Sequence, residues 1–204
     1  MNFVDFARKI TIEVEKSIYR EYVKSTFDIN AIRVHFIPAN SELLNTNKEF
    51  ASCLRYYIDS QTRGLTLKDD IILKYIKDDG LEDKYLEGDI IIFEVQYPEG
   101  TAEEDGTNQY LSVLTHELMH AMFKGIPNDS ECGAGYDEAC TDFLAENFFG
   151  EKYFTTYKQL VELKRGTNCL NENLILMCYS KFDEMSEIEK SVVLNHYFNG
   201  EPVE

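Results

Sequence analysis

Apolar residues recur at every third or fourth position over much of this 204-residue chain, which is the spacing of one face of an α-helix. In the N-terminal half the pattern predicts helices over residues 1–25, 40–59 and 71–76. In the C-terminal half it predicts helices over residues 107–124, 136–149, 153–164, 170–179 and 184–198. The C-terminal half is therefore expected to be helical throughout.

Two segments of the N-terminal half have the character of strands. Over residues 29–37 apolar residues alternate with polar ones, and Pro38 follows. His35 falls on the polar side of this alternation, so we expect it to face solvent or to be hydrogen-bonded rather than to bind a metal. Residues 89–97 are rich in β-branched and aromatic side chains and predict the second strand. Strands in the first half and helices in the second indicate an α+β fold.

The length of the chain fits a single domain over residues 1–204, with a helix-and-strand half over 1–106 and a helical half over 107–204. An acidic segment rich in turn-forming residues, 98–108, is expected to form a surface loop between the predicted strand at 89–97 and the helix that follows it.

The net charge limits the possible partners. The formal charge is −17 at pH 7, so the chain would repel both a phosphate backbone and an anionic membrane surface. We therefore expect no nucleic acid and no membrane as partner. A peptide or protein with basic or neutral residues suits this negative charge better.

The cysteines and the N-terminal residues indicate the cellular compartment in which the protein is expected. There are five cysteines, an odd number, and none forms a Cys-x-x-Cys pair, which favours reduced thiols over a disulfide framework. The first 20 residues are charged throughout and contain no uninterrupted apolar segment of the kind found in signal peptides. We therefore expect a cytoplasmic protein.

The clearest chemical motif is His116-Glu117-Leu118-Met119-His120, which reads His-Glu-x-x-His within an apolar segment. On a helix, residues four apart differ by about 40° in direction, so both imidazoles leave the same face one turn apart. Two imidazoles so placed can bind one Zn²⁺. Glu117 would stand beside the metal and could take a proton from a metal-bound water.

A zinc site needs a third protein ligand, and a catalytic site leaves the fourth position to water. Glu138 is our first choice because it lies in the first turn of the next predicted helix, which an antiparallel arrangement would bring back to the motif. Asp142 follows one turn later on the same face and could orient a metal-binding histidine by accepting its free N–H group. Glu146 is the reserve ligand, and the other ligands left open are Asp137, Cys132, Cys140 and His196.

The motif followed by Glu138-Ala139-Cys140-Thr141-Asp142 resembles the gluzincin pattern of thermolysin-like metallopeptidases. The resemblance covers residues 89–150. It implies that His116, His120 and Glu138 bind zinc, that Glu117 is the general base, and that Asp142 orients a histidine. It also implies a zincin-like fold, with a small mixed sheet over the active-site helix and residues 89–97 as the edge strand along which a peptide lies.

The chain departs from that family in two respects. It is shorter than thermolysin-like enzymes and shows no recognisable propeptide, so a minimal gluzincin describes it better. The arrangement is also similar to that of the ImmA/IrrE-type metallopeptidases, which cut a regulatory protein. The downstream residue that stabilises the oxyanion in the family is not identified by any motif here, and the possible residues are His196, Tyr136, Tyr153 and Tyr157.

The function predicted from the sequence is therefore that of a zinc metallopeptidase, an endopeptidase rather than an exopeptidase, with one Zn²⁺ per chain and a peptide or protein as substrate. The alternative is a non-catalytic zincin-like module that binds or regulates a protein and carries a structural zinc or none. Glu117 argues against the alternative, because a purely structural site has no need of a carboxylate between its histidines.

Overall fold

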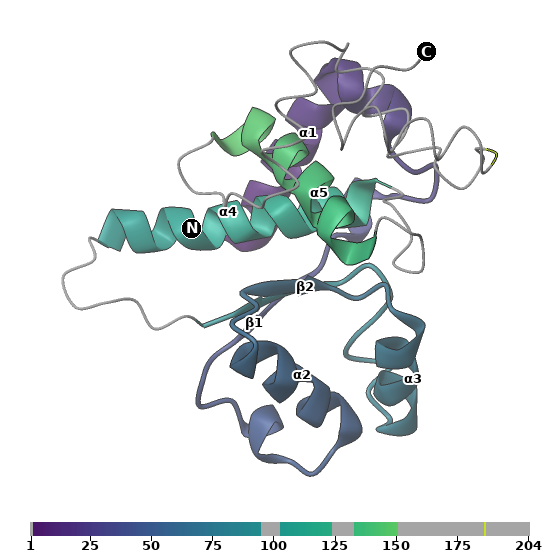
Figure 1. Cartoon of the computed structure of the whole chain (residues 1–204), viewed down its shortest axis with the longest axis vertical. Coiled ribbons are helices and arrows are strands. Elements are labelled where there is room, and N and C mark those ends of the chain that lie inside the picture. The colour runs from purple at the N-terminus through teal and green to yellow at the C-terminus, as the bar shows by residue number, and fades with distance from the viewer. Residues whose placement is uncertain (1, 95–102, 124–132, 151–185, 187–204) are drawn as a thin grey trace. The chain divides into compact units, whose positions relative to one another are not determined.

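The computed structural model describes residues 2–94, 103–123, 133–150 and 186 (Figure 1). The chain divides into two compact units, one made of Met1–Thr11 and Asp28–Ala121 and the other of Ile12–Phe27 and Met122–Glu204. The fold is mixed α+β, as the sequence predicts. The single domain over residues 1–204 stays a prediction, and each unit is described by itself below.

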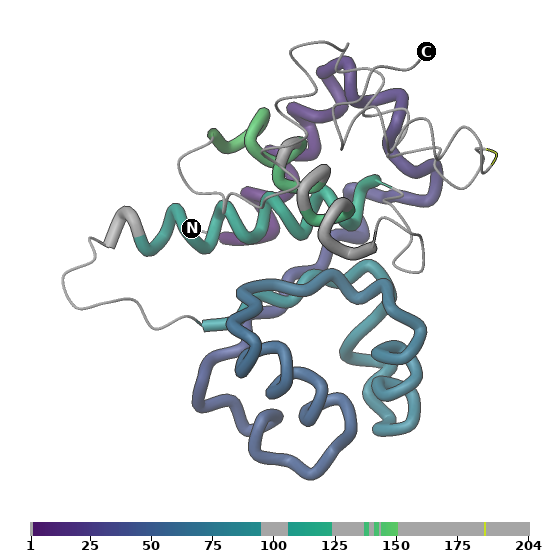
Figure 2. The backbone as a smooth tube through the Cα atoms, in the orientation of Figure 1, coloured from purple at the N-terminus to yellow at the C-terminus, as the bar shows by residue number. Residues whose placement is uncertain are grey.

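The first unit is built on a three-stranded mixed sheet in the order β1-β3-β2. β1 (Val34–Ile37) pairs with β3 (Ile90–Phe93) in parallel, and β2 (Gly64–Thr66) pairs with β3 in antiparallel. Figure 2 shows the chain leaving β2, passing through helix α3 and returning to β3. All four residues of β3 are buried, as expected for a strand with neighbours on both sides and layers on both faces.

This strand order corrects one expectation. β3 is the central strand over residues 90–93, so the prediction that the strand at 89–97 is an edge strand is wrong for these residues. Glu94 follows the strand, and residues 95–97 lie outside the described part of the chain. Strand β2 was not predicted from the sequence.

Helices α2 (Glu49–Asp59) and α3 (Asp70–Asp78) cover one face of the sheet (Figure 1). The core on this face is a cluster of buried side chains from both helices, from the strands and from the segments next to them: Ile37, Phe50, Leu54, Leu67, Ile72, Ile76, Tyr85, Ile91 and Phe93. The carboxylate of Asp69 begins α3 by accepting hydrogen bonds from the backbone N–H groups of Ile71 and Ile72. Gly80, with φ of +65°, follows the end of α3.

Helix α4 (Glu103–Met122) contributes its residues up to Ala121 to the same unit and covers the other face of the sheet (Figure 1). It begins earlier than predicted, so residues 103–108 are helical rather than part of the expected acidic loop. The predicted end signals after residue 123 lie outside the described residues.

The predicted N-terminal helix is shorter than expected. α1 spans Phe3–Lys16, and a 3₁₀ helix follows over Ile18–Tyr22. Ser17 separates the two, because its backbone is extended and its hydroxyl accepts a hydrogen bond from the N–H of Tyr19.

Two further predicted elements are also shorter. Residues 29–31 form a 3₁₀ helix capped by Asp28, so β1 begins only at Val34. The helix predicted over 40–59 is split into a 3₁₀ helix, Glu42–Asn45, and α2, because the chain is extended at Thr46. The Arg55 guanidinium stabilises this break by donating to the carbonyl of Thr46, at 3.0 Å.

The second unit contains the end of α1, the 3₁₀ helix Ile18–Tyr22 and helix α5 (Gly133–Phe149). The ring of Tyr19 meets that of Phe148 edge to face, with centroids 5.6 Å apart. α5 ends at Phe149, as predicted. Gly150 follows with φ of +100°, and its N–H donates to the carbonyl of Glu146. The helices predicted between residues 153 and 198 lie outside the described residues. Within the part of the chain that the structure describes, no helix is both long and apolar enough to cross a membrane.

Candidate metal centre

The two histidines of the motif lie on α4, one turn apart as predicted. Their ring centroids are 4.8 Å apart and the ring planes are inclined at 78°. His120 is 5% exposed and Glu117 is 7% exposed, so the polar side chains of the motif are largely covered. Apolar residues of α4 bury the rest of this segment: Leu111, Leu114, Leu118, Met119 and Met122.

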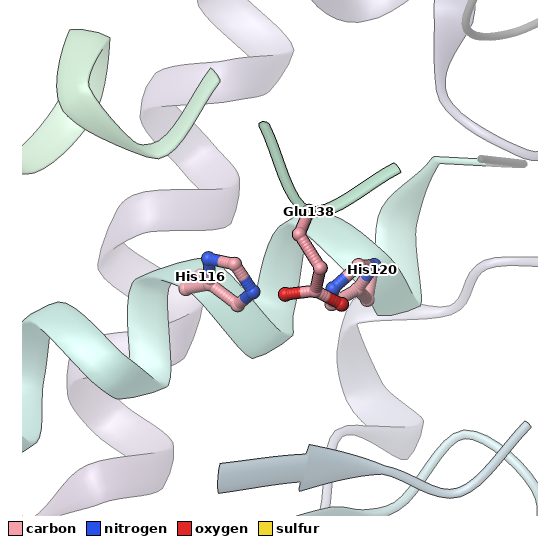
Figure 3. Close-up of side chains that lie close together, drawn as sticks. All are labelled: His116, His120 and Glu138. Carbon is pink, nitrogen blue, oxygen red and sulfur yellow. The ribbon is translucent and has the colours of Figure 1, made fainter. Parts of the chain in front are cut away.

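Glu138 completes a group of three possible metal ligands. One ligand atom from each of His116, His120 and Glu138 lies within 4.8 Å of the others. In Figure 3 the carboxylate of Glu138 points toward the space between the two imidazole rings. Zinc binds nitrogen and oxygen ligands at about 2 Å, so three ligand atoms on one ion lie within about 4 Å of each other. The donor types, two imidazoles and one carboxylate, fit a divalent transition metal.

The alternatives to Glu138 are placed differently. Asp137 and Asp142 are buried on α5, at 2% and 3% exposure, and Glu146 is half-buried. Within the described residues, the group that could hold a metal contains Glu138 and none of these three. The role of Asp142 in orienting a histidine stays a prediction.

The remaining candidates are not tested. Cys132, Tyr153, Tyr157 and His196 lie outside the described residues. Tyr136 and Cys140 belong to α5, but their side chains are not among those described.

Strand β2 holds Glu117 from the side of the sheet, which the sequence did not predict. The hydroxyl of Thr66 lies 2.9 Å from the Oε2 atom of Glu117 and 2.8 Å from its backbone carbonyl oxygen. A Cβ atom added to Gly64 would stand 2.6 Å from Cγ1 of Val113 and 2.8 Å from Cγ of Glu117. Only glycine therefore lets β2 approach α4 this closely, and the approach brings the Thr66 hydroxyl to the carboxylate.

A lysine lies next to the metal-ligand candidates. The Nζ atom of Lys68, two residues after β2, is 3.2 Å from Nδ1 of His120. Leucines alternate with other residues in Gly64-Leu65-Thr66-Leu67-Lys68, which is the pattern of a strand. The segment is too short for this alternation alone to identify a strand, so the contacts of Thr66 and Lys68 were not predicted.

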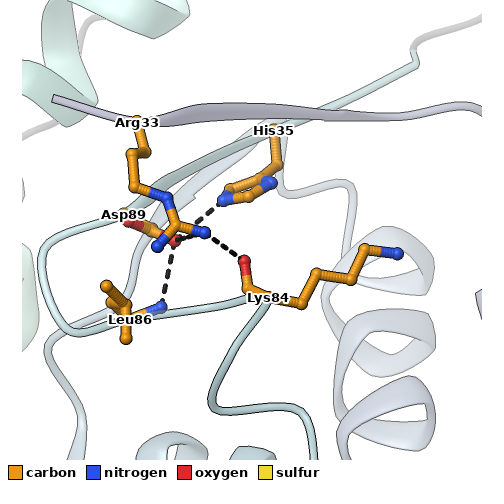
Figure 4. Close-up of polar contacts among 5 residues, drawn as sticks. All are labelled: Arg33, His35, Lys84, Leu86 and Asp89. Carbon is orange, nitrogen blue, oxygen red and sulfur yellow. Dashed lines mark hydrogen bonds and ion pairs between the residues drawn. The ribbon is translucent and has the colours of Figure 1, made fainter.

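His35 is hydrogen-bonded, as predicted from its place in the alternation. Its Nε2 atom is 2.8 Å from Oδ2 of Asp89, which is 2% exposed. The same carboxylate oxygen accepts from the N–H of Leu86 at 3.0 Å and lies 3.5 Å from the Arg33 guanidinium, which in turn donates to the carbonyl of Lys84 (Figure 4). Burial, and then the Asp89 carboxylate, raise the pKa of Tyr85. These contacts tie β1 to the turn before β3 and give His35 a structural role.

No protein-family model, no curated protein and no solved structure matches this chain. The fold and the site by themselves define a mixed α+β protein with a candidate metal-binding group of two histidines and one glutamate.

Proposed function

We propose that this chain is a zinc-dependent metallopeptidase of the minimal gluzincin kind. The observation that carries the proposal is the buried carboxylate of Glu117, which is adjacent in sequence to His116 and held in place by the Thr66 hydroxyl. A carboxylate in this position serves no purpose in a site that only binds metal, but it is the group that a hydrolase needs as its base.

His116, His120 and Glu138 would hold the metal ion. A zinc ion bound there would polarise the carbonyl group of the scissile peptide bond and make a water molecule more acidic. Two imidazoles and a carboxylate are a ligand set that suits zinc and leaves a position open for the reaction.

Glu117 would act as the general base and then as the general acid. Its carboxylate takes a proton from the attacking water as the water oxygen bonds to the carbonyl carbon. The same proton then passes to the amide nitrogen as the C–N bond breaks, which releases an amine and a carboxylic acid. The Thr66 hydroxyl, 2.9 Å from Oε2 of Glu117, holds the carboxylate in one orientation for this step.

The substrate would be an extended peptide, and β2 is the better strand to receive it. Among the strands that the structure describes, β1 and β2 lie at the edges of the sheet and β3 is central. β2 is favoured over β1 because its Thr66 hydroxyl contacts the Glu117 carboxylate. An extended peptide can add to an exposed strand edge through backbone hydrogen bonds. An endopeptidase is favoured because such pairing needs no free peptide terminus.

The test combines metal analysis with a cleavage assay on an unfolded protein substrate. We expect one zinc per chain. We expect Glu117→Gln to keep the metal and to lower turnover by about 10²–10⁴-fold, since only the base is removed. Glu138→Gln should lose metal affinity, whereas Glu87→Gln, an exposed control with the same charge change, should behave like the parent protein.

If Glu117→Gln cleaves as fast as the parent protein, Glu117 is not the base and the proposed mechanism is wrong. If the parent protein binds one zinc but cleaves none of the substrates offered, the non-catalytic alternative is favoured instead.

A further inference from the structure

Alternate residues of β2 and its extension face α4 in a regular series. The chain remains paired with the segment before β3 beyond Thr66, because the N–H of Leu67 donates to Asp89 and the carbonyl of Leu67 accepts from Gly88. Side chains alternate between the two faces within β2, and the contacts of Leu67 with the core and of Lys68 with His120 follow the same alternation. Gly64 and Thr66 meet Glu117, and Lys68 meets His120, which is three residues further along α4.

The opposite face of the same segment explains why this series is fixed. Leu67 is completely buried in the core formed with α2 and α3, and Leu65 packs against that core. Because these leucines point away from α4, Gly64, Thr66 and Lys68 must point toward it. The contact of Lys68 with His120 is thus a consequence of the strand's register.

The chemistry of this contact conflicts with metal binding. A lysine ammonium group can only donate hydrogen bonds, so Nδ1 of His120 must accept at 3.2 Å. A neutral imidazole whose Nδ1 accepts carries its proton on Nε2. In this arrangement one nitrogen of His120 is occupied by Lys68 and the other by a proton, so neither has a lone pair available for a metal.

We propose that Lys68 competes with the divalent metal ion for His120 and so lowers the affinity of the site for metal. The inference rests on the proposed metal site but not on peptidase activity. Metal binding has to displace the Lys68 ammonium from Nδ1, and the displaced ammonium still stands near a doubly charged ion.

The first test measures the affinity of metal-free protein for Zn²⁺ by competition with a chromophoric chelator. We expect Lys68→Met to bind Zn²⁺ about tenfold more tightly than the parent protein, because a nearby positive charge is removed. Lys68→Arg keeps the charge and should stay close to the parent value. Lys74→Met, an exposed position whose ammonium pairs with Asp78, makes the same change in net charge and should also have no effect.

Lys68 is exposed, so its substitution should leave the fold intact. An affinity of Lys68→Met equal to or weaker than that of the parent protein overturns the inference, as does a failure of both proteins to bind Zn²⁺. Loss of peptidase activity alone does not bear on it, because the measurement uses the metal and no substrate.

A second measurement examines the tautomer directly. Two-bond correlations between the ring protons and ring nitrogens in ¹⁵N NMR distinguish the Nε2–H form of a histidine from the Nδ1–H form. In the metal-free parent protein we expect His120 as Nε2–H, and in Lys68→Met we expect a shift toward Nδ1–H. Finding the Nδ1–H form in the parent protein would refute the proposed contact.

Discussion

Replacing Thr66 by valine tests whether strand β2 positions the base. Valine has nearly the shape of threonine but lacks the hydroxyl, which lies 2.9 Å from the carboxylate and 2.8 Å from the backbone carbonyl of Glu117. One hydroxyl hydrogen serves these two acceptors in turn, so Thr66→Val leaves both oxygens facing a methyl group. Thr66 and Glu117 are 4% and 7% exposed, and water therefore has little access to replace the lost donor.

A hydrogen bond to a charged group contributes about 1.5–3 kcal/mol, and we expect the free energy of unfolding of Thr66→Val to fall by that amount. For a chain of this size each kcal/mol lowers the Tm by about 2–4 °C. If the hydroxyl also aims the carboxylate, turnover should fall at least about tenfold, which corresponds to about 1.4 kcal/mol in the barrier. The affinity for Zn²⁺ should not change, because Glu117 is not one of the three proposed ligands.

Thr66→Ser is the matched control. It keeps the hydroxyl and loses one methyl group, so its stability should fall by about 0.8 kcal/mol while turnover stays near the parent value. Urea unfolding and a peptide-cleavage assay on the three proteins are sufficient. If Thr66→Val loses stability but keeps full turnover, the hydroxyl has only a structural role, and the reasoning that β2 positions the base is refuted.

Two further substitutions probe the packing around the sheet. Gly64→Ala should lower the free energy of unfolding by about 1–3 kcal/mol in urea and should lower turnover, because the new Cβ would overlap α4 side chains. Gly80→Ala is the control. A Cβ there meets no atom within 4 Å, so this substitution should cost only the strain of its positive φ, about 1 kcal/mol. A smaller loss at Gly64 than at Gly80 would contradict the close approach of β2. Asp89→Asn should lower the free energy of unfolding by about 2–4 kcal/mol, because it removes a buried charge from its partners. Asp78→Asn, in an exposed ion pair, should change it by less than about 1 kcal/mol, and equal effects at the two positions would refute a structural role for Asp89.

The metal side of the site could be predicted from the sequence because it depends on local geometry. The i, i+4 spacing of His116 and His120 places both rings on one face of any helix, and Glu138 was selected from the first turn of the next helix. The structure brings these three residues together. The burial of Glu117 and His120 is consistent with the apolar segment in which the motif lies.

The contacts of strand β2 with the site could not be predicted in the same way, because strand order is determined by pairing between distant segments. β2 has three residues and begins with glycine, which has a low strand propensity, and it is stabilised by pairing with β3 and by its approach to α4. Nothing in residues 89–97 distinguishes a central strand from an edge strand when the third strand is not recognised. The contacts of Thr66 and Lys68 with α4 depend on that strand and were missed with it.

The register of β2 links the hydrophobic core to the candidate metal centre. Deleting or inserting one residue immediately before Gly64 would exchange the two faces of this segment. The leucines that fill the core would then point at α4, and the glycine, hydroxyl and ammonium would be driven into the apolar cluster. A change of one residue in the chain length here would therefore damage folding and chemistry together, so this short strand should tolerate substitution far better than it tolerates any change in its length.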